Sequence, residues 1–180
     1  SNGEGEGVVL FGGEALTENS YFENVPDAIE YISMNKGIIR NNYVTTSPDD
    51  AIDLNACNNI LIERNYLFNN KDKAISIGTE QYGASIKNIV VKNNLIVKNK
   101  SAISIKDSSV AYISNNTLFK NESINNFISS YVHHKANTST LMQAINENIL
   151  KHTKFGFAIR DAINVQSITN LAARDFSSIP

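Results

Sequence analysis

A short repeat running down the chain constrains its fold more than any other feature. The dipeptide Ala-Ile opens similar segments at Ala28, Ala51, Ala74 and Ala102. A column of Asn residues accompanies these segments, with first intervals of 23 residues: Asn19, Asn42, Asn65, Asn94, Asn116 and Asn148. A unit this short cannot bury its own apolar face, so successive copies must stack on their neighbours. The repeat therefore predicts a solenoid.

Each repeat divides into short apolar runs, rich in β-branched residues and bounded by Asn, Asp, Gly or Pro. One copy contains Ala51–Asn55, Ile60–Arg64 and Tyr66–Phe68. Such runs are typical of strands separated by turns, whereas helical periodicity is poor over residues 8–120. Short strands in coils of about 22–30 residues indicate an all-β fold, a parallel β-helix. The alternation of a strand then turns Ile52 inward and Asp53 outward.

The Asn column has a physical explanation at the corners of such coils. Asn tolerates the left-handed backbone conformation, and its amide can hydrogen-bond to its own turn. Stacked Asn side chains can also hydrogen-bond to one another along a ladder. We therefore expect these residues to shape one corner of each coil rather than to carry chemistry.

The length of 180 residues suits a single domain. Residues 1–7 are polar and Gly-rich, like a tag or linker, so we expect one β-helix domain over residues 8–180 that becomes irregular from about residue 121. Phe157–Arg160 resembles a further Ala-Ile segment. No clear capping helix is visible at either end, which suggests a fragment of a larger protein, unless the termini cap the solenoid irregularly.

Charge and hydropathy narrow the classes of partner. The net charge of −2 gives no electrostatic case for binding nucleic acid. No apolar run reaches the length of about 18 residues that a membrane-spanning helix needs. The single Cys57 excludes an intramolecular disulfide, and we interpret it as a core or turn residue rather than a nucleophile.

Aligning the coils on the Ala-Ile segments gathers acidic residues on one patch of the outer surface. Asp27, Asp50 and Lys73 then share the position before Ala, and Glu30, Asp53 and Ser76 share the position two after it. Asp49 stands beside Asp50 at the turn that enters the strand. Stacked strands lie about 4.8 Å apart, so carboxylates on adjacent coils repel each other unless something neutralises them.

Three interpretations of this patch stay open. The first, which we favour, is a bound Ca²⁺ with Asp27, Asp49, Asp50 and Asp53 as ligands, because Ca²⁺ takes six to eight oxygen ligands in a flexible geometry. The second is a ladder of ion pairs in which Lys71 and Lys73 of the next coil neutralise the carboxylates. The third is a set of solvated turns, since Asp is common at turn starts.

The repeats resemble the right-handed parallel β-helices of the pectate-lyase-like superfamily over about residues 15–120. The segment Asp49–Asp53, together with Asp27 one coil earlier, is similar to the calcium-binding motif of family 9 polysaccharide lyases. That resemblance implies Ca²⁺, an anionic polysaccharide substrate and cleavage of a uronate polymer by β-elimination. The sequence segments Asp72–Gly78 and Ile105–Ser109 also resemble segments of non-catalytic β-helix modules in bacterial surface proteins. Both likenesses imply a secreted or cell-surface location, and the second implies further domains.

The chemistry of β-elimination separates the two readings. A bound Ca²⁺ acidifies the proton beside the uronate carboxylate, and a Lys with a lowered pKa removes it. In the lyases that Lys lies one coil later on the column of Asp53, where this chain has Ser76. Lys106 and Lys73 are the candidate bases on neighbouring columns, and Asp50 is expected to keep Lys73 protonated. We therefore expect a module with an acidic, Ca²⁺-binding outer face, with the lyase as the alternative.

Aromatic residues offer a means of contacting sugar rings. Tyr43 and Tyr66 follow the Asn of successive coils, so we expect them to stack on each other inside the coil. Further Tyr residues stand at Tyr21, Tyr82 and Tyr112. A glycoside hydrolase is disfavoured, because the Gly-His-Gly and Arg-x-Lys boxes of β-helix hydrolases do not occur. The expected partner is an anionic polysaccharide or surface glycan.

Overall fold

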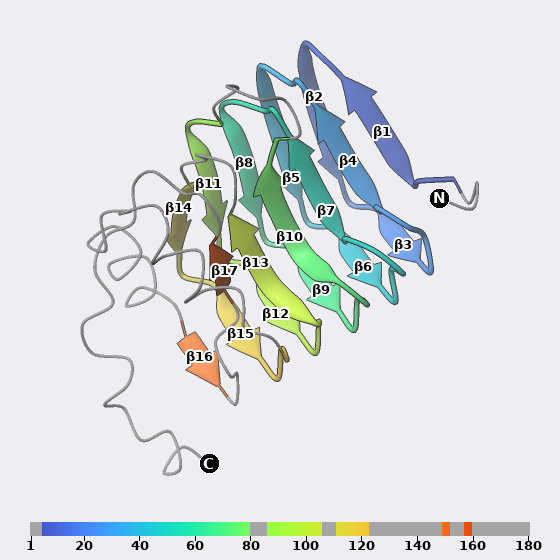
Figure 1. The fold of residues 1–180 in the computed structure, drawn as a ribbon, viewed down its shortest axis with the longest axis vertical. Coiled ribbons are helices and arrows are strands. Elements are labelled where there is room, and N and C mark those ends of the chain that lie inside the picture. Colours follow the sequence, from blue (N-terminus) through green and yellow to red (C-terminus); the bar gives the residue numbers. More distant parts are fainter. Residues whose placement is uncertain (1–4, 80–85, 106–110, 123–148, 152–156, 160–180) are drawn as a thin grey trace.

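A computed structural model describes residues 5–79, 86–105, 111–122, 149–151 and 157–159. Its strands form a stack of coils, each of which passes once through three parallel sheets (Figure 1). Sheet A contains β1 (Val8–Phe11), β4 (Ile29–Ile32), β7 (Ile52–Asn55), β10 (Lys73–Gly78), β13 (Ser101–Ile105) and β17 (Phe157–Ile159). Sheet B contains β2 (Glu14–Glu18), β5 (Lys36–Arg40), β8 (Ile60–Glu63), β11 (Ile89–Lys92) and β14 (Ala111–Ser114). Sheet C contains β3 (Tyr21–Glu23), β6 (Tyr43–Thr45), β9 (Tyr66–Phe68), β12 (Leu95–Val97), β15 (Thr117–Phe119) and β16 (Ile149–Lys151).

The predicted parallel β-helix is confirmed, and the described residues contain no helix. The Ala-Ile segments pair as expected, since Ile52 lies between Ile29 and Ile75 and Ile75 pairs with Ile103. These Ile side chains are fully buried, whereas the outward Asp53 is only partly buried. Burial of this continuous apolar interior is what holds coils that could not fold singly.

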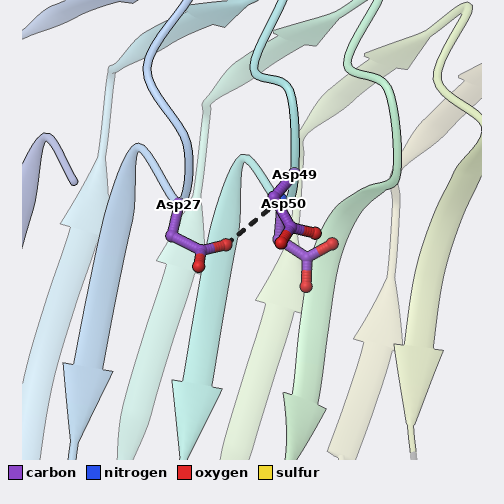
Figure 2. A group of neighbouring side chains, drawn as sticks. All are labelled: Asp27, Asp49 and Asp50. Atoms are coloured by element: carbon purple, nitrogen blue, oxygen red, sulfur yellow. Dashed lines mark hydrogen bonds between the residues drawn. The ribbon is translucent and has the colours of Figure 1, made fainter. Parts of the chain in front are cut away.

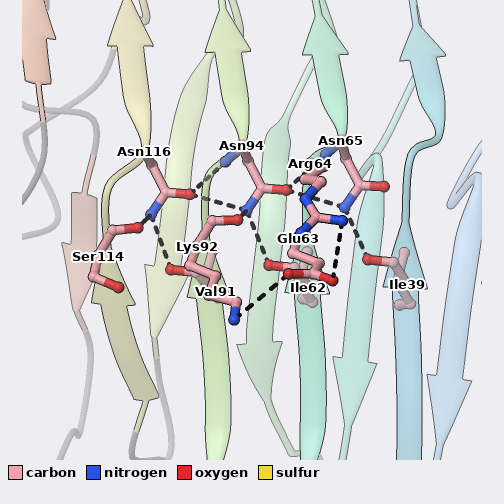
Figure 3. Close-up of polar contacts among 10 residues, drawn as sticks. All are labelled: Ile39, Ile62, Glu63, Arg64, Asn65, Val91, Lys92, Asn94, Ser114 and Asn116. Carbon is pink, nitrogen blue, oxygen red and sulfur yellow. Dashed lines mark hydrogen bonds and ion pairs between the residues drawn. The ribbon is translucent and has the colours of Figure 1, made fainter.

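Residues in the left-handed backbone conformation make the corner that joins sheets B and C, which we call corner BC. They directly follow the strands of sheet B and comprise Asn19, Asn41, Arg64, Asn93 and Asn115, with φ between 53° and 57°. The residue after each of the last four carries the hydrogen-bonded ladder: Asn42, Asn65, Asn94 and Asn116. Figure 3 shows the last three of these Asn residues. The left-handed conformation and the ladder therefore belong to two neighbouring columns, not to one.

The placement of Asn19 in the ladder was wrong. Glu18 pairs with Arg40, so Asn19 aligns with Asn41, and Ser20 occupies the ladder position. The backbone N–H of Ser20 donates to Asn42 Oδ1 at 3.1 Å, as the N–H of Asn42 donates to Asn65 Oδ1 at 3.0 Å. Asn148 lies outside the described residues.

A second Asn ladder, which the sequence analysis missed, runs along the corner between sheets C and A, called corner CA. Asn70 Nδ2 donates to Asn99 Oδ1 at 2.7 Å, and Asn99 Nδ2 donates to Asn121 Oδ1 at 2.9 Å. The N–H of Ser47 donates to Asn70 Oδ1 at 2.9 Å and starts the ladder. Each member follows its partner in the first ladder by five residues, as Asn70 follows Asn65, so the spacing could have revealed it.

The described strands of the later part of the chain, β16 and β17, extend sheets C and A. β16 pairs with β15, and β17 pairs with β13, so Phe157–Ile159 adds a rung to sheet A as the Ala-Ile likeness suggested. Its register is shifted by two residues, however, because Ala158 pairs with Ser104 rather than with Ala102. Cys57 is fully buried and its thiol donates to the carbonyl of Tyr31, which confirms it as a core residue.

Candidate functional site

Three carboxylates gather at corner CA, where the chain enters sheet A (Figure 2). Asp27 precedes β4, and Asp49 and Asp50 precede β7 one coil later. One oxygen from each of the three carboxylates lies within 4.8 Å of the others. The structure thus brings together three of the four predicted metal ligands, which we call the acidic corner.

The backbone of corner CA holds two of these carboxylates, Asp27 and Asp50, in place. Asp27 adopts a positive φ of 38°, and its Oδ1 accepts a hydrogen bond from the N–H of Asp50 at 3.2 Å. Asp50 Oδ1 accepts in turn from the N–H of Lys73 at 2.9 Å. The hydroxyl of Ser47 donates to the carbonyl of Val25 and also contacts the carbonyl of Asp50. Asp27 and Asp50 therefore each cap the turn of the following coil.

Lysines neutralise only one end of this column. Lys73 Nζ lies 2.9 Å from Asp50 Oδ1 and 2.6 Å from Asp72 Oδ2, and Lys100 Nζ lies 3.3 Å from Asp72 Oδ1. This arrangement matches the ion-pair ladder interpretation for Asp50. Among the described residues, no Lys or Arg forms an ion pair with Asp27 or Asp49.

The carboxyl pKa values reflect this uneven neutralisation. Burial raises the pKa of Asp27 to about 7, and the charges of Asp49, Asp50 and Asp53 add to the rise. Burial also raises the pKa of Asp50 to about 6, although the ammonium of Lys73 opposes it. Burial would likewise raise the pKa of Asp72, but Lys73 and Lys100 outweigh it and lower that pKa. The acidic corner therefore favours either protons or a cation.

Asp53, the fourth predicted ligand, lies apart from the other three. It projects from β7 and pairs with Glu30 of β4 and Ser76 of β10. Its charge acts on both Asp27 and Asp50 and raises their pKa values. Asp53 thus adds to the negative potential of the corner without belonging to the compact group of three carboxylates.

Of the two candidate catalytic lysines, only Lys73 lies within the described residues. Burial alone would lower the pKa of Lys73, but Asp50 and Asp72 raise it above its ordinary value, the opposite of what a general base needs. Lys106 lies outside the described residues. Ser76, which occupies the position of the lyase base, is fully buried in β10.

Aromatic side chains form a row on the outer face of sheet C. Tyr21 stacks on Tyr43 with ring centroids 5.2 Å apart, and Tyr43 meets Tyr66 edge to face at 4.9 Å. The expected contact between Tyr43 and Tyr66 is therefore confirmed, but its expected place inside the coil was wrong. The inward positions of β6 and β9 belong to Val44 and Leu67, which are fully buried. Tyr82 lies outside the described residues.

The family of the chain follows from its sequence as well as its fold. The family described as "Right handed beta helix region" matches residues 1–141. This chain is a member of that right-handed β-helix family. Searches of curated proteins and of solved structures found no match. Within the described residues, no helix has the length and apolarity to cross a membrane.

Proposed function

We propose that this chain is a non-catalytic β-helix module whose acidic corner holds a Ca²⁺ ion and whose outer surface binds an anionic glycan at a secreted or cell-surface location. The observation that carries the cation site is the approach of three carboxylates to within 4.8 Å, of which only Asp50 has a lysine partner. Proximity of like charges raises their energy, and a divalent cation relieves it.

The rigidity of the corner supports this proposal. Asp27 and Asp50 are fixed by backbone hydrogen bonds from the next coil, so their oxygens are positioned before any ion arrives. Asp49 is exposed and able to adjust. Three carboxylates fill only part of a Ca²⁺ shell of six to eight oxygens, so water or carbonyl groups would complete it.

The second candidate function is a Ca²⁺-dependent polysaccharide lyase. The resemblance of Asp27 and Asp49–Asp53 to the lyase calcium motif favours it. The ion pairs of Lys73 and the burial of Ser76 weigh against it, because neither side chain can accept a proton from a sugar near neutral pH. A lyase reading consequently depends on Lys106.

A thermal-shift experiment and an absorbance assay test the two parts of the proposal. Ca²⁺ at millimolar concentration should raise the Tm of the wild-type protein, because a ligand that binds only the folded state stabilises it. Asp49→Asn should reduce the shift, whereas the matched change Glu14→Gln, at an exposed carboxylate paired with Lys36, should not. No shift in the wild type would reject the cation site.

The absorbance assay addresses catalysis. β-Elimination of a uronate polymer creates an unsaturated product that absorbs in the ultraviolet, and a module produces none. We expect no such product from polygalacturonate with Ca²⁺. Product formation that Lys106→Ala abolishes would replace the module with the lyase.

A further inference from the structure

The outer face of sheet C carries a path of aromatic rings, exposed at Tyr21 and partly exposed beyond it, that lies outside the acidic corner. Tyr21 is 62% exposed and begins the path at the first coil. Tyr43 and Tyr66 continue it one rung at a time, and Tyr66 then meets Phe68 with ring centroids 5.9 Å apart. We call these four residues the aromatic row. Their rings repeat at 5.2 and 4.9 Å along Tyr21, Tyr43 and Tyr66, the spacing of the coils themselves.

Lysines border the far end of this row. Lys98 Nζ lies 5.6 Å from the ring centroid of Phe68, and Lys120 Nζ lies 5.2 Å from that of Phe119 on β15. Both lysines are exposed, and no carboxylate of the described residues forms an ion pair with either of them. We call Lys98 and Lys120 the basic edge. Cation–π contacts hold the two ammonium groups over the rings while leaving their charge available to a ligand.

The basic edge follows the aromatic row directly in the fold. Lys98 and Lys120 each come immediately after a strand of sheet C, and Phe68, Val97 and Phe119 share one column across β9, β12 and β15. The surface therefore changes along the helix axis from stacked phenol rings to positive charge. One end of this surface is therefore aromatic and the other end is positively charged.

We propose that the aromatic row and the basic edge form the binding site for an anionic polysaccharide laid along the helix axis. This inference deepens the proposed glycan-binding role but does not use the acidic corner. The sugar chain lies across Tyr66 and the outward edges of Tyr21 and Tyr43, which stack on each other. The spacing of the coils is close to the length of one sugar in an extended chain. Lys98 and Lys120 then pair with carboxylates or sulfates further along the same chain.

Charge complementarity selects this ligand over a second copy of the protein. The protein is acidic overall, with a net charge of −2, so an exposed pair of lysines beside aromatic rings is a local exception. Single-stranded nucleic acid shares the anionic and stacking chemistry, so it serves as one arm of the test.

Calorimetric titration with three probes tests the site: an oligogalacturonate, its fully methyl-esterified form, and a single-stranded oligonucleotide. We expect the oligogalacturonate to bind most tightly, and more weakly as salt is added. Tyr43→Ala should weaken binding about tenfold, and Tyr43→Phe should restore most of it because the ring remains. Lys98→Ala should weaken binding of the acid and leave binding of the ester unchanged.

Matched control variants lie on sheet B and at its edge. Tyr112→Ala removes a Tyr that is 69% exposed on β14, and Lys87→Ala removes an exposed lysine outside the row. Neither should alter affinity. The folded state of each variant is verified by its Tm, so that lost binding is not confused with unfolding.

Several outcomes would overturn the inference. Absence of oligogalacturonate binding, tighter binding of the oligonucleotide, or equal losses in Tyr43→Ala and Tyr112→Ala would each do so. Asp49→Asn separates this site from the cation site, because it should reduce Ca²⁺ stabilisation and leave glycan binding intact. If Ca²⁺ has no effect while the oligogalacturonate binds, the cation site fails and the aromatic site stands.

Discussion

Two columns of side chains run along the corners of this β-helix with the same spacing and opposite chemistry. In the ladder at corner BC, each Asn Nδ2 donates to the Oδ1 of the Asn in the next coil, as Asn65 does to Asn94 and Asn94 to Asn116 (Figure 3). At corner CA, Asp27 and Asp50 stack in the same way but carry only acceptors (Figure 2). An amide can repeat indefinitely along a stack, whereas a carboxylate cannot.

This difference explains why hydrogen-bond donors and acceptors are matched along the Asn column but not along the Asp column. The Asn ladder is buried, with Asn65, Asn94 and Asn116 at most 2% exposed, and every rung supplies what the next one needs. The Asp column must change chemistry after two rungs, where Lys73 takes the third position and pairs with Asp50. The ladder therefore stabilises the fold by itself, and the acidic corner depends on protons or a cation.

The change Asn94→Asp places a carboxylate in the Asn ladder and should have the largest effect on stability. The new anion would face Asn116 Oδ1 and the carbonyls of Ile62 and Lys92, which now accept hydrogen bonds from Asn94 Nδ2. We expect a loss of about 4 kcal/mol in the free energy of unfolding, measured with urea. The control Asn93→Asp makes the same change at the exposed neighbouring residue, whose left-handed conformation Asp tolerates. Equal effects at both positions would contradict the role of the ladder.

Removing the shared carboxylate of the other column should have a smaller effect. Asp50→Ala deletes the acceptor for both the N–H and the Nζ of Lys73, although Nζ keeps its contact with Asp72. We expect a loss of about 2 kcal/mol in the free energy of unfolding. Asp49→Ala, which alters an exposed carboxylate of the same turn, should change it by about 0.5 kcal/mol or less. A larger loss at Asp49 would show that the ion pair is not the main stabilising contact.

The sequence predicted most of this comparison but not its register. Adjacent Asn pairs, such as Asn41–Asn42 and Asn93–Asn94, supply one residue to the left-handed turn and the other to the ladder, and either assignment fits the letters. Where only one Asn is present, it can take either place. In Asn19–Ser20 the Asn is the left-handed residue, whereas in Arg64–Asn65 the Asn belongs to the ladder. Only strand pairing resolves the choice.

The candidate site was predictable to a similar degree. Stacking on the Ala-Ile segments placed Asp27 and Asp50 together correctly and paired Asp50 with Lys73. The separation of Asp53 from the other three carboxylates was not predictable. Asp27, Asp49 and Asp50 lie in the turns before β4 and β7, and these turns bring them closer together than strand alternation alone implies. The outward direction of Tyr43 was also missed, since a three-residue strand holds too little alternation to fix which face is buried.

The acidic corner, unlike the Asn ladder, should also make stability depend on pH. The folded pKa of Asp27 is raised to about 7 from an ordinary value of 3.8, so the folded state binds more protons than the unfolded state between these values. Its contribution to stability is full below pH 3.8 and is lost as the pH rises through about 7. With a chelator present, the Tm advantage of Asp27→Asn over the wild type should therefore grow from about pH 4 to about pH 7 and then level off. A difference that stays constant with pH would mean that Asp27 is not strained by its neighbours.

Titration of the wild-type protein with Ca²⁺ by calorimetry, at about pH 8, where the carboxylates are ionised, tests the cation site most directly. The account predicts saturable binding of one ion, weakened by Asp27→Asn and by Asp49→Asn and unchanged by Glu14→Gln. It also predicts proton release when the titration is repeated near pH 7, because Asp27 must lose its proton to bind. Absence of saturable binding at millimolar Ca²⁺, or binding unchanged by both Asp variants, would contradict it.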